Sequence, residues 1–206
     1  MPFTLAMIGM LVLASWLTGT STGVQLGARA IARLGFAPAD TASFDLVRAI
    51  MSAFVTNGPT AFWIALPATA ILAGITEWRN GSLKAATAFW GAHLITLGLS
   101  WALLVPLHLS GDPMGRLLFV ARDVGPSAGF MGCLGYMLFG LKGKAGPLSL
   151  AFGVVVLSGV LLMSLKTVAS EPAEVSAALS HLLALPVGFV LGLLMSRRPR
   201  PPARNV

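Results

Sequence analysis

The chain has 206 residues, of which 56% are hydrophobic and only 10% charged, and its mean hydropathy is +0.83. Soluble globular domains carry about a quarter charged residues, so this composition excludes most soluble enzymes, nucleic-acid readers and disordered modules. The net charge is +7, but the basic residues fall between apolar runs instead of clustering with aromatic side chains. The charge pattern therefore predicts a protein of the lipid bilayer with no nucleic-acid partner.

Apolar runs follow one another along nearly the whole chain, and about 20 apolar residues cross a hydrocarbon core. The runs predict six spans, at about residues 3–20, 60–78, 84–108, 125–141, 147–168 and 174–195. The first run is not preceded by basic residues, so it predicts a helix and not a signal peptide. The expected fold class is an all-α membrane protein with six transmembrane helices in one domain, residues 1–196.

The charged parts of the chain predict how it meets the membrane surface. Residues 21–59 mix charged and apolar side chains and predict an amphipathic interfacial segment, with 44–51 lying along the interface. With both termini inside, the inner segments hold eight basic residues and the outer segments six. The positive-inside rule then favours cytoplasmic termini in a multi-pass protein, with residues 197–206 as a disordered basic tail.

Two polar side chains inside the predicted spans are candidates for chemistry, because polar groups are costly in a membrane. Ser127 opens the fourth span within Gly-Pro-Ser-Ala-Gly at 125–129, and His181 lies in the sixth span. A rise of 1.5 Å per residue puts both roughly 10 Å below the outer edge of the core. A serine and a histidine at one level on adjacent helices can act as nucleophile and general base.

Small residues predict that these two helices pack closely, because glycine and alanine let backbones approach in lipid. The fourth span contains five glycines, and the sixth has small residues at regular spacing after His181. These are Gly125, Gly129, Gly132, Gly135 and Gly140, and Ala184, Gly188 and Gly192.

Together these features resemble the rhomboid family of intramembrane serine proteases, over about residues 44–196. The resemblance rests on Ser127 opening a short glycine-rich helix, and on His181, 54 residues later, followed by small residues at positions +3, +7 and +11. Residues 74–81 are similar to the family's G-x-x-x-E-x-x-x-G stretch at the end of the second helix. Residues 45–54 resemble the amphipathic lead-in to that helix.

The resemblance implies a rhomboid-like bundle of six transmembrane helices in a cell membrane, with a bacterial membrane as the expected location. It implies an intramembrane serine endopeptidase with Ser127 as nucleophile and His181 as general base. The expected substrates are single-pass membrane proteins cleaved near the outer face. Neither a cofactor nor a metal is expected, because histidines and carboxylates do not cluster at ligand spacing.

Departures from the family pattern define an alternative. Rhomboid proteases usually carry a histidine and, four residues later, an asparagine on the second helix, where this chain has Ala61 and Ala65. Met131 replaces an aromatic residue one turn after the serine, and Pro126 lacks an N–H. The alternative is a catalytically weak or inactive rhomboid-like protein that binds transmembrane segments. A transporter or channel component is disfavoured, because neither a buried acidic residue nor a repeated half is visible.

The remaining polar residues have structural interpretations. His93 and His108 are expected to make interfacial or interhelical hydrogen bonds, with a substitute oxyanion donor as the other reading. Asp123 is expected to pair with Arg122 or to cap its loop. Glu77 and Arg79 are expected to form an ion pair at the inner end of the second helix.

Overall fold

The computed structural model describes residues 1–43 and 45–196, and within them it contains helices, 3₁₀ turns and one isolated β-bridge. The longer helices are α1 (Pro2–Thr18), α4 (Pro59–Asn80), α5 (Ser82–Leu109), α7 (Ser127–Phe139), α8 (Ala145–Ser164) and α9 (Pro172–Ser196). The shorter elements are η1 (Thr20–Thr22), α2 (Ala28–Leu34), η2 (Pro38–Ser43), α3 (Leu46–Ser52), α6 (Pro113–Val120) and η3 (Leu165–Thr167).

Each predicted apolar run overlaps one of the longer helices. In the described residues four helical segments are long and apolar enough to cross a membrane, namely α4, α5, α8 with η3, and α9. Helices α1 and α7 have 17 and 13 residues, fewer than the roughly 20 that span a hydrocarbon core. The chain is therefore an all-α membrane protein with four candidate spanning helices. Membrane crossing by α1 and α7 stays a prediction.

Helix α7 lies at the centre of the bundle, against α4, α5, α8 and α9, and its contact with α9 is the most extensive in the molecule. A Cβ atom on Gly188 would lie only 2.0 Å from the carbonyl oxygen of Gly132, and a Cβ on Gly135 would lie 2.0 Å from that of Leu185. Only glycine fits such an approach, so the predicted packing of small residues between these two helices is confirmed.

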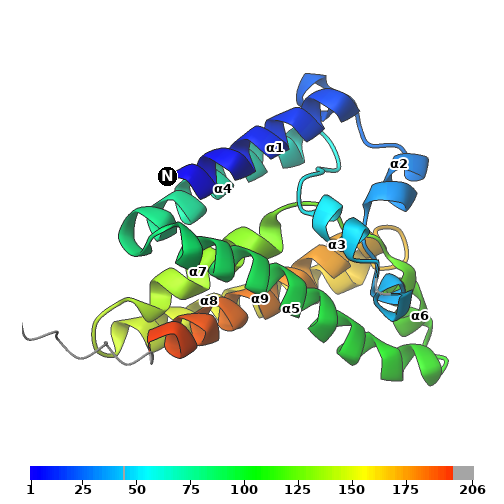
Figure 1. Ribbon diagram of the computed structural model, residues 1–206. Coiled ribbons are helices and arrows are strands. Elements are labelled where there is room, and N and C mark those ends of the chain that lie inside the picture. Colours follow the sequence, from blue (N-terminus) through cyan, green and yellow to red (C-terminus); the bar gives the residue numbers. More distant parts are fainter. Residues whose placement is uncertain (44, 197–206) are drawn as a thin grey trace, which may run out of the picture.

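Helix α1 lies beside α4 (Figure 1), and a buried carboxylate joins them. Glu77, which is 4% exposed, accepts hydrogen bonds from the backbone N–H of Phe3 (3.0 Å) and Thr4 (2.8 Å) and from the hydroxyl groups of Thr4 and Ser82 (each 2.6 Å). The predicted ion pair with Arg79 is wrong, because residues two positions apart on a helix do not face each other. Glu77 instead satisfies amides at the start of α1.

The chain between α1 and α4 forms short elements, and α2, α3 and α6 lie at the same end of the molecule (Figure 1). Asp45 caps α3 by accepting from the N–H of Arg48 at 3.0 Å. Helix α3 exposes Leu46, Val47 and Ile50, as an interfacial position predicts. Phe44 and the predicted tail, 197–206, lie outside the described residues.

Candidate functional site

Ser127 is the first residue of α7, and the local sequence leaves that helix end open. The N-cap residue is Pro126, whose side chain forms no capping hydrogen bond. The first backbone hydrogen bond of the helix runs from the N–H of Phe130 to the carbonyl of Pro126 at 3.0 Å. The N–H groups of Ser127, Ala128 and Gly129 therefore have no acceptor within the helix. They present hydrogen-bond donors and the positive end of the helix dipole beside the Ser127 hydroxyl.

The loop that leads into Ser127 is held by backbone hydrogen bonds to the segment before α4. Phe36 and Asp123 form an antiparallel bridge, with N–H to carbonyl distances of 3.1 and 3.0 Å. The N–H of Gly125 donates to the carbonyl of Ser52 at 2.8 Å. Gly125 has φ +133°, a backbone conformation that residues with a Cβ rarely adopt. Phe36 and Ser52 thus fix the path of the chain into α7.

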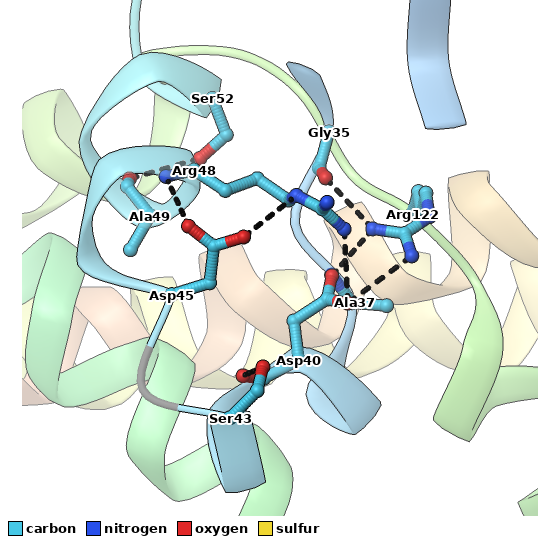
Figure 2. A network of polar contacts seen from close by, with 9 residues as sticks. All are labelled: Gly35, Ala37, Asp40, Ser43, Asp45, Arg48, Ala49, Ser52 and Arg122. Atoms are coloured by element: carbon cyan, nitrogen blue, oxygen red, sulfur yellow. Dashed lines mark hydrogen bonds and ion pairs between the residues drawn. The ribbon is translucent and has the colours of Figure 1, made fainter. Parts of the chain in front are cut away.

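A network of charged side chains covers the same junction (Figure 2). The Arg122 guanidinium binds both carboxylate oxygens of Asp40 and the carbonyl of Gly35 (3.0 Å). Arg48 bridges Asp40 (3.1 Å) and Asp45 (3.2 Å). Burial opposes ionisation of Asp40, but the hydrogen bonds from Arg122 and the Ala37 amide outweigh it and hold the pKa of Asp40 below its usual range.

Asp123 does not take part in that network, so the predicted pairing with Arg122 is wrong, because Arg122 reaches Asp40, 82 residues away. Its carboxylate accepts from the N–H of Val124 at 2.8 Å, which matches the other expectation, a local loop cap. Burial raises the pKa of Asp123 to about 7, against the opposing effect of that one hydrogen bond.

The packing of α7 on α9 sets the level of His181 relative to Ser127. Gly188 of α9 lies against Gly132, and Gly192 lies against Phe139. These partners are 56 and 53 positions apart in the sequence, so the two helices run parallel with a nearly constant offset. Ser127 and His181 are 54 positions apart. The register therefore carries both residues to the same end of the helix pair at a similar level.

Within the described residues Ser127 and His181 are not joined by a hydrogen bond. Both side chains are half-buried, and Nε2 of His181 is buried without a hydrogen-bond partner. Catalytic hydrogen bonds are often long in the absence of substrate and tighten in the complex. The helices thus bring the predicted pair to one level, and the pair itself stays a prediction.

His93, on α5, is buried next to the same region. Its Nε2 lies 2.8 Å from the carbonyl oxygen of Ala49 in α3, which confirms the expected interhelical hydrogen bond. Its Nδ1 is also buried and has no partner among the described residues. His108, nearer the end of α5, stacks on Phe119 of α6 with ring centroids 4.2 Å apart.

A small cavity brings His93, Asp123 and Ser127 together, with about 10 Å³ for the centre of a water molecule. His181 does not line it, although its neighbour Ser180 does. The full lining is Ser52, His93, Leu97, Asp123, Val124, Gly125, Ser127, Ala128 and Ser180. Sequence reasoning did not place His93 beside Ser127. The available signal was a histidine in the middle of a long apolar run, since polar groups in a membrane interior have a function by default.

The described residues contain no group of three or more histidine, cysteine or acidic side chains placed to hold a metal ion. No protein-family model matches the chain, and neither a curated protein nor a solved structure matches it.

Proposed function

We propose that the protein is an intramembrane serine endopeptidase of rhomboid type, with Ser127 as nucleophile and His181 as general base. The observation that carries the proposal is the position of Ser127. It begins a central helix whose first N–H groups are uncapped, at the level of a histidine whose Nε2 is buried and unpartnered. A buried nitrogen without a hydrogen bond destabilises the fold. A hydrogen bond from the Ser127 hydroxyl or from a substrate would remove that cost.

In this mechanism Nε2 of His181 takes the proton from the Ser127 hydroxyl as its oxygen attacks the substrate carbonyl. The same histidine then gives that proton to the leaving amine. The negative oxygen of the intermediate lies at the start of α7, where the N–H groups of Ser127 and its neighbours donate to it. These backbone donors stand in for the side chains that the family usually supplies where Ala61 and Ala65 occur here.

The proposed substrates are single-pass membrane proteins whose helices unwind near the outer face. A stable helix keeps its carbonyl groups in internal hydrogen bonds, so cleavage needs a weakened helix end. The proposal places six helices across a cell membrane, expected to be bacterial, with both termini in the cytoplasm. Ser127 then lies close to the outer surface, where the loop ending at Pro126 enters the bundle.

A second candidate is a catalytically weak or inactive rhomboid-like protein that binds transmembrane segments. Two observations favour it: alanines at 61 and 65 replace the usual oxyanion side chains, and Ser127 is not hydrogen-bonded to His181. Such a protein uses the same helix-lined site for recognition only.

Cleavage of a reporter transmembrane helix by the purified protein in lipid nanodiscs separates the two candidates. For the enzyme, Ser127→Ala and His181→Ala each abolish cleavage, and the double variant is no worse than either single variant, because nucleophile and base act as one unit. Ser170→Ala, at an exposed serine before α9, is the control and keeps full activity. Cleavage that survives in Ser127→Ala contradicts the proposal. A wild type that binds the reporter without cutting it, as both alanine variants do, favours the binder.

A further inference from the structure

His93 lines the cavity beside Ser127, and its hydrogen bond to Ala49 determines which ring nitrogen carries the hydrogen. The Ala49 carbonyl can only accept, so Nε2 of His93, 2.8 Å away, carries the hydrogen. In the neutral ring the other nitrogen, Nδ1, is then a hydrogen-bond acceptor with an available lone pair. His93 is only 3% exposed, so bulk water does not solvate this nitrogen.

The size and lining of the cavity indicate what fits there. Its volume of about 10 Å³ for a water centre is close to the minimum that holds one water molecule. A buried water needs two to four polar partners. Its lining residues include His93, whose Nδ1 is buried without a partner, and Ser127, Ser180 and Asp123, which carry two hydroxyls and a carboxyl group. Space for one water is therefore lined by a residue that carries a buried acceptor without a donor.

We propose that this cavity is the site of the water that ends each catalytic cycle, and that His93 is a positioning residue that holds this water through Nδ1. The inference rests on the serine peptidase mechanism proposed above and adds a specific water site and a role for His93. A serine peptidase needs such a water, because its first step leaves the substrate acyl group attached to the serine oxygen. Inside a membrane that water must be held close to the ester.

The step consumes one water and releases one acid. The water leaves the cavity as its oxygen attacks the carbonyl carbon of the Ser127 ester, and Nε2 of His181, which does not line the cavity, takes one of its two protons. The bond between that carbon and Oγ of Ser127 breaks, and His181 returns the proton to Oγ, which restores the serine. The second water proton, hydrogen-bonded to Nδ1 of His93 until this point, leaves on the new carboxylic acid. Holding the attacking water in line converts a slow encounter into an intramolecular reaction.

His93→Gln tests the role of Nδ1 with the least change to the fold. The glutamine amide can still donate to the Ala49 carbonyl, but it places no acceptor where Nδ1 lies. Labelling of Ser127 by a fluorophosphonate probe needs the nucleophile and its base and no water, whereas turnover of a reporter helix needs the water. We expect turnover to fall by at least about tenfold, with labelling within about twofold of wild type. Intact-mass spectrometry should then detect accumulated acyl-enzyme.

His108→Gln is the matched control, because His108 lies on the same helix, also has a buried unpartnered Nδ1 and does not line the cavity. Turnover by this variant should match that of wild type. Ser180→Val is a second test that leaves His93 intact: its extra methyl groups occupy the space of the water, so it should give the same split between labelling and turnover.

Three results would overturn the inference. Unchanged turnover in both His93→Gln and Ser180→Val would show that neither Nδ1 nor the cavity is used. Equal losses of labelling and turnover in both variants would assign His93 a structural role only. A wild type that neither labels nor cleaves would refute the proposed function itself, and the water site with it. The first two results leave the proposed function standing, so the two failures are distinguishable.

Discussion

Two regions of the molecule are held together by different forces, and the candidate site lies where they meet. In the helical body, α7 and α9 approach so closely that glycine is required on both sides of the contact. At the end formed by residues 35–43, 45–52 and 121–125, backbone hydrogen bonds and the charged side chains around Asp40 hold the chain in place. In lipid the hydrophobic effect does not drive helices together, so close packing must stabilise their association. Networks of charged side chains are stable instead at a boundary with water. Ser127 comes directly after the charged end of the molecule and is the first residue of α7 in the helical body.

The glycine contact should respond most strongly to substitution. Gly188→Leu places side-chain atoms where the Gly132 carbonyl lies, since even a Cβ would approach its oxygen to 2.0 Å. Overpacking of a well-packed interior costs about 1–3 kcal/mol and occasionally more, and here the obstacle is backbone. We expect the upper end of that range or beyond, seen as a large fall in the thermal midpoint in detergent. Gly159→Leu, at a glycine of α8 with nothing within 4 Å, should be nearly neutral, and equal effects of both changes would contradict the close contact.

Substitution of Glu77 tests whether a polar contact inside the helical body contributes more to stability than the contacts at the charged end. Glu77→Gln keeps the shape but replaces one acceptor oxygen by a donor, which leaves an amide or hydroxyl of the α1 start without a partner. A buried group left unsatisfied costs about 1–3 kcal/mol, to be measured by denaturation in detergent. Arg79→Gln should change stability by less than about 0.5 kcal/mol. A larger effect at Arg79 than at Glu77 would restore the ion pair that the structure replaces.

The charged network should have a smaller and more local effect. Arg122→Gln removes the contacts to Asp40 and Gly35, and partly exposed ion pairs contribute only about 1 kcal/mol or less. Hydrogen exchange should nevertheless speed up at the amides of Asp123 and Gly125, which bond to Phe36 and Ser52. The difference from wild type should shrink in high salt. Arg116→Gln on α6 is the control, and faster exchange there too would argue against a specific role for Arg122.

Asp40 and Asp123 should shift the pH dependence of stability in opposite directions. The folded state lowers the pKa of Asp40 from 3.8, so its stabilising effect is present above about pH 4 and is lost as the pH falls through the lowered value. The pKa of Asp123 is raised from 3.8 to about 7. Between these values the folded state keeps a proton that the unfolded state releases, so stability falls as pH rises, by at most about 1.4 kcal/mol per pH unit.

Thermal midpoints measured in steps of about one pH unit, from about pH 3 to about pH 8, would test both of these pH dependences. Asp123→Asn should flatten the decline between about pH 4 and 7, and Asp40→Asn should remove the loss at the acid end. A decline that is unchanged in Asp123→Asn would show that this carboxyl group does not titrate in that window.

The helices could be predicted from sequence because apolar run length and helix length are coupled by the thickness of the membrane. The contact at Gly188 was predictable too, since small residues at regular spacing have few other uses in lipid. The partner of Arg122 was not, because Asp40 is 82 residues distant and adjacent Asp123 offered a simpler pairing. Long-range ion pairs leave no local pattern, and only the fold decides between them.

The shared level of Ser127 and His181 was predicted, whereas their pairing stays a prediction. Ser127 and His181 were placed at one level by counting residues from the helix ends, and the observed offset between α7 and α9 agrees with that count. His93 was a candidate in the sequence as a histidine within a long apolar run, but its place beside the cavity at Ser127 could not be predicted. It depends on which ring nitrogen faces the Ala49 carbonyl and on a cavity that four separate segments enclose.

Location of a serine-directed probe by peptide mass spectrometry tests the central claim most directly. We expect a fluorophosphonate to form one adduct in lipid nanodiscs, on the peptide that carries Ser127, and we expect that adduct to be lost in His181→Ala but kept in Ser170→Ala. This result would show that Ser127 is an activated nucleophile and that His181 activates it. Wild type without an adduct at Ser127, or labelling at Ser127 that is indifferent to His181, would contradict the account.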